Sequence, residues 1–319
     1  MVVAVVFSDL HLSLYSKFNQ GNKRTDNHFK VLFLINQLCL KYKCSALFCG
    51  DLFHKPEMME NGFLEQTMDR MINLNKGGFN IYAISGNHDM SDKNTLNSHS
   101  PSYIKTFSRV FKFIKCIDYT SAILKKSFVI HGVPYLDHNI GLNEYVKSLE
   151  LEEGKKHILM LHTDYPGAKD TDGQEVGTVE NLNLNTLSRF DLVLCGHIHK
   201  PQRLSKKVYM IGAPLQQRRT DKDCELGYWL LHDNLKMEFV PFTEFPKFID
   251  VEDESEIKDD SNYYTVIGKS KTIEEVSSHK ITKDLSKKRL VSRYFRSKGI
   301  KDDKKKKALL NVLKTVEND

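Results

Sequence analysis

Side chains that commonly bind metal ions occur in five short motifs between residues 9 and 199. In each motif the polar residues directly follow an apolar run of strand length. The residues concerned are Asp9 and His11 in VVFSDLHL, Asp51 in ALFCGDLFH, Asn87, His88 and Asp89 in SGNHD, His162 in ILMLHTD, and His197 and His199 in LVLCGHIHK. Carboxylate, amide and imidazole groups in this pattern indicate a metal site.

Strands must position these motifs. Apolar runs such as VVAVVF, SALFC, HILML and FDLVLC alternate with helical patterns such as HFKVLFLINQLCLKY, in which apolar residues recur at spacings of three and four. The alternation predicts an α/β fold, a layered β-sandwich flanked by helices. Ligands in α/β folds gather outside the carboxyl ends of strands, so we expect the five motif loops to converge on one place.

The ligand set indicates which metals would bind. Seven of the side chains, leaving out His88 and Asp89, offer oxygen and imidazole nitrogen without any thiolate. This set suits Mn²⁺, Fe or Zn²⁺ better than a structural zinc site rich in cysteine. Seven ligands are too many for one ion, whereas two ions that share a carboxylate would use all of them.

Each motif alone has an ordinary structural interpretation. Asp9 and His11 are common loop residues, GD around Asp51 is a frequent pair, and His162 fits a hydrogen-bonded histidine at a strand end. GHIH carries more weight, because the glycine removes a bulky flank beside two alternate imidazoles. The metal hypothesis therefore depends on all five motifs occurring together in this order.

The composition is that of a soluble globular protein, with 319 residues, 40% hydrophobic and 28% charged. No apolar run reaches the roughly 18 residues of a membrane span. MVVAVVFSDLHL fits a buried first strand better than a signal peptide. The six cysteines form no C-x-x-C pair, which favours free thiols in a reducing compartment. We expect the cytoplasm, that of the host if the chain comes from a phage.

We expect a catalytic domain over residues 1–242, a linker over 243–248 and a small C-terminal α+β domain over 249–319. The last region has fewer long apolar runs, with a strand pattern at YYTVIG and helical patterns near TIEEVSSH and KKKKALLNVLKTV. The apolar stripe of the final helical pattern fits core packing or docking against a partner helix.

The motifs DLH, GD, GNHD, a later single H, and GHIH resemble the five motifs of the calcineurin-like metallophosphoesterases, in the same order. The resemblance implies that one metal is held by Asp9, His11, Asp51 and His199. It implies that the other is held by Asp51, Asn87, His162 and His197. Asp51 would bridge the two ions.

Within that superfamily, GDLFH, SGNHD, GHIHKPQ and MIGAPLQQRR are similar to the SbcD type of DNA repair and recombination nuclease, including small phage nuclease subunits. This resemblance implies a Mn²⁺-dependent DNA exonuclease and endonuclease, with Mg²⁺, Fe or Zn²⁺ as alternatives. It also implies a homodimer, an SbcC-type coiled-coil ATPase as partner, and a C-terminal domain that caps DNA or binds the partner.

Cleavage of a DNA phosphodiester requires charge neutralisation, a nucleophile at neutral pH and a proton for the departing oxygen. Two metal ions would supply the first two by binding phosphate oxygens and giving a bridging hydroxide. The resemblance implies that His88 donates a hydrogen bond or proton at the phosphate, and we expect Asp89 to hold its other ring nitrogen. His54, in DLFH, would lie near the scissile phosphate, unless it is a surface-loop histidine.

Basic residues after the fifth motif are candidates for DNA contacts. The net charge is +6, which is compatible with a polyanionic partner but does not require one. The candidates are Arg203, Lys206, Lys207, Arg218 and Arg219. They would hold the nucleic-acid backbone near the metals, although a basic run is often only a solvated face.

Two other functions remain open. A small-molecule phosphodiesterase or phosphatase could use the same site, and a non-catalytic DNA-end-binding scaffold could keep the fold. The complete motif set speaks against the scaffold. DLFH and the C-terminal extension favour the nuclease over the small-molecule enzyme.

Overall fold

The computed structural model describes the chain except for residues 56–58, 76, 94–99, 177–181, 259 and 268–319. The chain divides into a larger unit, residues 1–249 and 258–265, and a second unit, residues 250–257 and 266–319. All five motifs lie in the larger unit. The helical patterns expected at 272–279 and 304–316 lie outside the described residues, and the boundaries at 242 and 248 stay predictions.

The first sheet of the larger unit has the strand order β12-β11-β1-β2-β3-β4. Its strands are β1 (Val2–Phe7), β2 (Ser45–Phe48), β3 (Ile81–Ala83), β4 (Ile114–Cys116), β11 (Gly227–His232) and β12 (Met237–Pro241). Strands β1 to β4 are parallel, and β11 and β12 continue the sheet in antiparallel pairing.

The second sheet has the order β5-β6-β7-β8-β10-β9. Its strands are β5 (Thr120–Leu124), β6 (Phe128–Val133), β7 (Lys156–His162), β8 (Leu192–Gly196), β9 (Gln202–Arg203) and β10 (Val208–Met210). The four inner strands are parallel, and the edge strands β5 and β9 are antiparallel to them.

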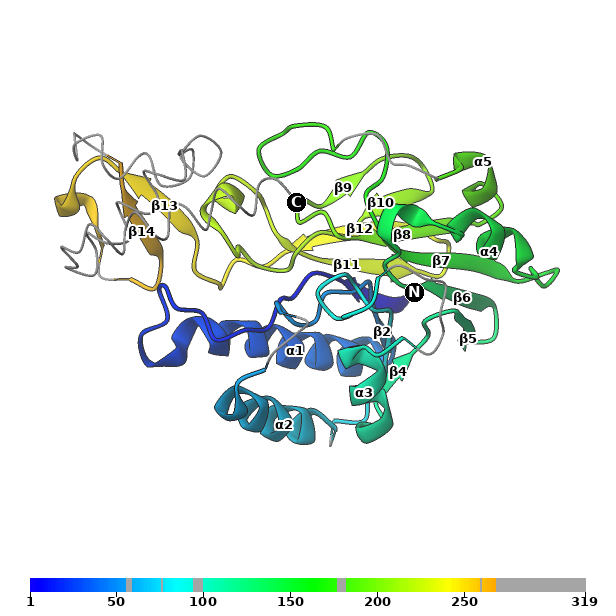
Figure 1. Cartoon of the computed structure of the whole chain (residues 1–319), viewed down its shortest axis with the longest axis horizontal. Coiled ribbons are helices and arrows are strands. Elements are labelled where there is room, and N and C mark those ends of the chain that lie inside the picture. Colours follow the sequence, from blue (N-terminus) through cyan, green and yellow to red (C-terminus); the bar gives the residue numbers. More distant parts are fainter. Residues whose placement is uncertain (56–58, 76, 94–99, 177–181, 259, 268–319) are drawn as a thin grey trace, which may run out of the picture. The chain divides into compact units, whose positions relative to one another are not determined.

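Helices cover the outer face of each sheet (Figure 1). The first sheet packs against α1 (Lys23–Tyr42), α2 (Asn61–Asn75) and α3 (Tyr103–Val110), and the second against α4 (Leu142–Ser148) and α5 (Leu184–Leu187). Short 3₁₀ turns occur at Gln20–Asn22, Asp137–Asn139, Arg219–Asp221 and Glu254–Glu256. Strands β13 (Phe248–Val251) and β14 (Tyr263–Val266) form a third sheet. None of the described helices is long and apolar enough to cross a bilayer.

The apolar runs explain this layering, because both faces of the inner strands are buried. In β1, Val5 and Phe7 pack towards the helices, while Ala4 and Val6 pack into the core between the sheets. Successive strand side chains point to opposite faces, so a continuous apolar run is what a doubly covered strand requires. The predicted layered α/β fold is confirmed, with helix, sheet, sheet and helix layers.

The parallel strands place the five motifs. Strands β1, β2, β3, β7 and β8 end at residues 7, 48, 83, 162 and 196, and each motif contains or directly follows such an end. Since strands β1 to β3 share one direction in the first sheet, and β7 and β8 share one in the second, their carboxyl ends lie at common sheet edges. These ends carry the candidate site.

Candidate metal centre

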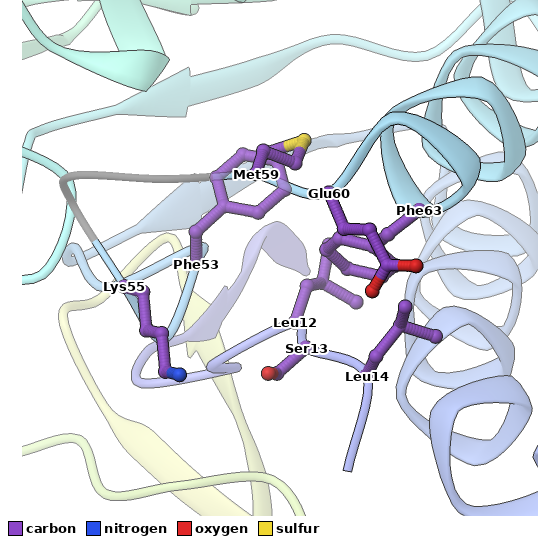
Figure 2. Close-up of a pocket in the computed structure, with 8 residues that line it drawn as sticks. All are labelled: Leu12, Ser13, Leu14, Phe53, Lys55, Met59, Glu60 and Phe63. Carbon is purple, nitrogen blue, oxygen red and sulfur yellow. The ribbon is translucent and has the colours of Figure 1, made fainter.

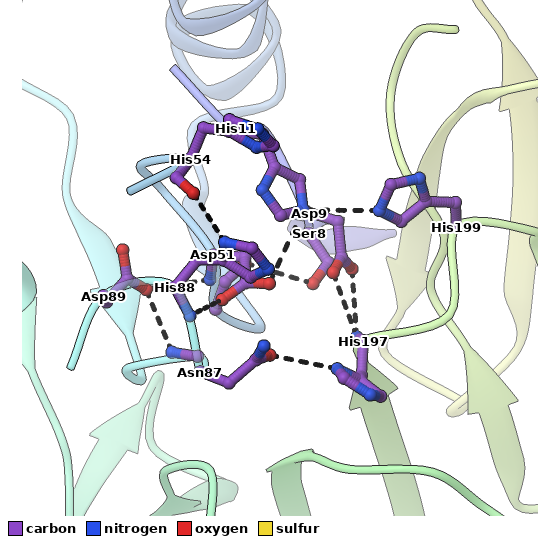
Figure 3. A network of polar contacts seen from close by, with 12 residues as sticks. Ser8, Asp9, His11, Asp51, His54, Asn87, His88, Asp89, His197 and His199 are labelled. Carbon is purple, nitrogen blue, oxygen red and sulfur yellow. Dashed lines mark hydrogen bonds and ion pairs between the residues drawn. The ribbon is translucent and has the colours of Figure 1, made fainter. Parts of the chain in front are cut away.

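The seven predicted ligands come together as two groups. In the first, the ligand atoms of Asp9, His11 and His199 lie within 4.8 Å of one another, and in the second those of Asp51, His162 and His197 do so. The amide oxygen Oδ1 of Asn87 lies 3.0 Å from His162 Nε2 and 3.0 Å from His197 Nδ1, which adds it to the second group. Figure 3 shows several of these side chains pointing toward one another.

Asp51 connects the two groups. Its Oδ2 lies 3.5 Å from His11 Nε2 and 3.4 Å from His162 Nε2. Burial opposes ionisation of this carboxyl, but the imidazoles of His162 and His11 hold the pKa of Asp51 below its usual range. An ionised carboxylate between two ligand groups is the geometry that a bridging ligand requires.

The backbone at the ligands is in a conformation that most residues avoid. Four of the seven have positive φ: 51° at Asp9, 49° at His11, 61° at Asp51 and 95° at His197. A left-handed residue other than glycine costs about 1–3 kcal/mol and persists only where its surroundings impose it, often at functional sites. Because this costly conformation occurs at four residues of the motifs, it supports a functional role for the loops that carry them.

Glycines allow the loops to approach each other. A Cβ atom on Gly86 would collide with Asp51 Oδ1, and one on Gly196 would collide with the backbone oxygen of Cys49. The glycines of GNHD and GHIH are therefore required by close packing between the loop after β3, the loop after β2 and the end of β8.

Hydrogen bonds orient the imidazoles. His162 Nδ1 donates to the backbone oxygen of Cys49 at 2.7 Å, which leaves Nε2 facing Asp51. His197 Nε2 lies 3.4 Å from Asp164 Oδ1. Among the described residues His199 Nδ1 has no hydrogen-bond partner, and the nearest carboxylate oxygen, Asp221 Oδ2, lies 3.8 Å away. Metal-bound histidines commonly pair their second nitrogen with a carbonyl or carboxylate, as His162 does.

The residues fit divalent ions. The carboxylates of Asp9 and Asp51 are buried in one place, which is costly without cations. His11 Nε2 and His199 Nε2 face each other at 3.3 Å, and among the described residues His11 Nδ1 is buried without a hydrogen-bond partner. Burial lowers the pKa of His197 to about 4, and the neutral imidazole is the form that binds metal.

His88 lies beside the first group. Its ring centroid is 4.7 Å from that of His11, its backbone N–H donates to Asp51 Oδ1 at 2.8 Å, and its Nδ1 donates to the backbone oxygen of His54 at 2.6 Å. Because a carbonyl oxygen can only accept, Nδ1 carries the proton and Nε2 is left to exchange one.

The expected role of Asp89 is wrong. Its carboxylate accepts four backbone N–H groups instead of a ring nitrogen of His88, from Asp51, Leu52, Phe53 and Gly86, at 2.8 to 3.2 Å. Successive N–H groups in a turn form an anion-binding concavity, which a buried carboxylate fills. Asp89 thus fixes the loop that carries Asp51, while His54 holds the ring of His88.

His54 is exposed and lies near the first group. Its ring stacks on that of His88 at 5.5 Å, and the ligand atoms of His11, His54 and His88 lie within 4.8 Å of one another. The next residue, Lys55, lines a cavity of about 120 Å³. In Figure 2 the amine of Lys55 and the hydroxyl of Ser13 lie on the same side of this cavity, away from the Glu60 carboxylate.

The five basic candidates for DNA contact occupy different places. Lys207 Nζ donates to the backbone oxygen of Phe190, and Val208 pairs with Val193, near the start of β8. The three steps from Val193 to Gly196 span about 10 Å at 3.3 Å per residue. Because β10 runs parallel to β8, the turn before β10 lies at the start of β8, and the metal groups lie at its end. Lys206 and Lys207 are in that turn, so they do not line the metal groups, contrary to the prediction.

Arg203 lies in β9 with its guanidinium 5.8 Å from the Tyr209 ring, and donates to the backbone oxygen of Ser205. Arg218 and Arg219 are exposed, and Arg218 Nε lies 3.4 Å from Asp221 Oδ1. Because Asp221 also contacts His199, Arg218 belongs to the surroundings of the metal groups. Asp221 is not among the residues predicted from the sequence, because no motif or spacing links it to His199.

Two relatives are similar to this chain in sequence. The chain is 27% identical over 207 residues to protein 244L of Invertebrate iridescent virus 6, named as a phosphoesterase; the match covers 60% of this chain and 68% of the relative. It is 25% identical over 295 residues to the DNA double-strand break repair protein Mre11 of Nanoarchaeum equitans (strain Kin4-M), covering 82% and 75%.

Among solved structures, a dimetal phosphatase from Danio rerio aligns with a TM-score of 0.46 at 10% identity, over 71% of this chain and 90% of that one. The family model described as calcineurin-like phosphoesterase matches residues 3–201, a span that contains all seven predicted ligands. The chain therefore belongs to the calcineurin-like phosphoesterase family.

Proposed function

We propose that this phosphoesterase is a DNA nuclease that depends on two divalent metal ions, with Mn²⁺ as the preferred metal. The relative named as a DNA double-strand break repair protein supports DNA as the substrate, because its match extends over 82% of this chain. The observation that carries the proposal is the position of His88, next to two facing ligand groups that share Asp51.

The residues divide the work of phosphodiester hydrolysis. When bound, the ions would neutralise the phosphate and activate the attacking water. They would be held by Asp9, His11, Asp51, Asn87, His162, His197 and His199. His88, with Nδ1 held by the His54 carbonyl, would supply a proton from Nε2 to the leaving oxygen as the P–O bond breaks.

Two further features favour a polynucleotide over a small ester. Lys55 places a cation at the cavity beside His54, and Arg218 places another near His199 through Asp221. A DNA strand carries phosphates on both sides of the scissile one, and cations at these positions would attract them. A small ester offers no such neighbouring phosphates.

We also propose an assembly for this nuclease, which is supported by the resemblance of its motifs to those of the SbcD type. We infer a homodimer that works in the cytoplasm with an SbcC-type coiled-coil ATPase. In this assembly the C-terminal region, residues 249–319, would cap DNA or contact the ATPase.

The test is cleavage of end-labelled duplex, hairpin and single-stranded DNA by purified protein, with bis-p-nitrophenyl phosphate assayed in parallel. We expect DNA cleavage with Mn²⁺, loss of cleavage with EDTA, and recovery on adding Mn²⁺. The variant Asp51→Asn, prepared identically, excludes a contaminating nuclease. Hydrolysis of the small ester without cleavage of any DNA, with or without the ATPase, would refute the nuclease and favour the small-molecule enzyme.

A further inference from the structure

Arg24, at the start of α1, is a buried cation, only 6% exposed. Among the described residues it makes no ion pair with a carboxylate; its guanidinium donates to the backbone oxygens of Lys17, at 3.2 Å, and Gln217. A buried charge without a counter-ion is costly, so its surroundings must offset the cost in another way.

Aromatic rings provide that compensation. The guanidinium carbon lies 3.9 Å from the ring centre of Tyr15, 5.5 Å from that of Tyr263 and 5.6 Å from that of Phe248. The rings of Phe248 and Tyr263 also pack on each other, with centroids 5.0 Å apart. Cations within about 6 Å of a ring centre are attracted to its face, and the attraction grows when both are desolvated.

Two partners of Arg24 reach the metal-binding loop. Gln217, whose carbonyl accepts from Arg24, donates from its side-chain Nε2 to the backbone oxygen of Asp9. Tyr15, whose ring lies under the guanidinium, donates its hydroxyl to the backbone oxygen of His11 at 2.6 Å. The two carbonyls that are held in this way belong to Asp9 and His11, whose backbones are left-handed.

We propose that Arg24 is a positioning residue of the metal centre, which holds Asp9 and His11 in their left-handed conformation through Gln217 and Tyr15. The proposal rests on the metal centre of the proposed function. Without these bonds the backbone bonds from Asp9 N–H to Gly50 and from His11 N–H to Asp51 would remain, but the two carbonyls would each lose a partner, so the side chains of Asp9 and His11 would be held less firmly at their common ion.

The geometry requires arginine. One planar guanidinium lies over the ring of Tyr15 and donates to two carbonyls at the same time. Lysine offers a charge of the same sign but a single nitrogen and no plane to stack. Arg24→Lys therefore removes the bond geometry while keeping the charge.

The test measures Mn²⁺ binding to metal-free protein by isothermal titration, alongside DNA cleavage and thermal unfolding. For Arg24→Lys we expect Mn²⁺ affinity to fall about 10-fold or more, as for other residues that orient metal ligands. The concentration of Mn²⁺ needed for half-maximal cleavage should rise in parallel, with the KM for DNA at saturating Mn²⁺ unchanged. Tyr15→Phe, which keeps the ring and loses only the hydroxyl, should give a smaller loss and serves if Arg24→Lys does not fold.

Arg70→Lys is the matched control. Arg70 also lies over a ring, 4.8 Å from Phe29, and pairs with Asp26, but in the described part of the chain neither of these residues is hydrogen-bonded to Asp9 or His11. The Arg70→Lys variant should bind Mn²⁺ with the same affinity as the wild type. Folded Arg24→Lys and Tyr15→Phe variants with wild-type Mn²⁺ affinity would overturn the proposal. A wild type that binds Mn²⁺ without cleaving DNA would instead refute the nuclease function alone.

Discussion

His88 and Asp89 are adjacent in the sequence, but their side chains serve different loops. The ring of His88 lies beside His11, whereas the carboxylate of Asp89 accepts backbone N–H groups from Asp51 to Phe53. In a tight turn, neighbouring side chains can point in unrelated directions. We therefore expect His88 to act in the chemistry and Asp89 to fix the position of Asp51.

Replacing His88 separates these roles. His88→Ala should keep metal binding and lower kcat by about 10²- to 10⁴-fold, the usual contribution of a positioned acid or base. The measurement is metal content together with single-turnover cleavage. His232→Ala, a histidine paired with Glu238 on β11 and β12, is the control and should cleave normally. Loss of both metals from His88→Ala would show that His88 is a ligand instead.

The sequence predicted the site residues unevenly. The seven predicted ligands, which the structure brings together, could be selected because each follows an apolar run, and strand ends are where α/β folds gather ligands. Asp89 was misassigned because its partners are backbone N–H groups, which every residue has. No sequence pattern indicated a role for Arg24, Gln217 or Asp221, because each contacts a carbonyl or an imidazole of a residue that is not near it in the sequence.

At the scale of elements, the buried strands were predicted within a few residues of their observed bounds. Strands β4, β5, β9 and β13 were not predicted, since they are short or exposed at sheet edges and lack a continuous apolar run. The wrong placement of Lys206 and Lys207 has its cause in the order of the strands. The two lysines are close to GHIH in sequence, but the chain must return to the opposite end of the sheet before it can form a parallel strand.

Close packing between loops gives a prediction at this scale. Gly86→Ala should destabilise the protein by about 1–3 kcal/mol, as overpacking does, and should also weaken metal binding, because the added methyl group displaces Asp51. Gly62→Ala, in α2 with no heavy atom within 4 Å of the new Cβ, is the control. It should be neutral or stabilising by up to about 1 kcal/mol.

Chemical denaturation and metal titration of both variants provide the measurement. Equal stability and equal metal affinity of Gly86→Ala and wild type would contradict the close approach of the loops after β2 and β3.

At the scale of the whole molecule, buried neutral histidines are expected to make the folded state less stable at acid pH. Burial lowers the pKa of His28 to about 3 and that of His131 to about 4. In the unfolded chain both would titrate near 6.5. Below that value these two imidazoles take up protons in the unfolded state but not in the folded state, so their contribution to the free energy of unfolding falls as the pH drops from about 6.5 towards 4.

Urea denaturation of metal-free protein at pH 7.5 and pH 5 measures this effect. We expect the change in midpoint from pH 7.5 to pH 5 to be more favourable to the folded state in His131→Asn than in wild type, because the variant lacks the proton uptake of His131 on unfolding. An unchanged difference in that variant would mean that His131 does not contribute to the acid sensitivity.

The central claim is that strand-end loops from two sheets build one centre for two ions around Asp51. Its most direct test is the Mn²⁺ stoichiometry after equilibrium dialysis, measured for wild type and Asp51→Asn. We predict two Mn²⁺ ions per wild-type chain and loss of tight binding at both positions in Asp51→Asn, since the bridging carboxylate serves both. One ion or none in the wild type, or two tightly bound ions in Asp51→Asn, would contradict the account.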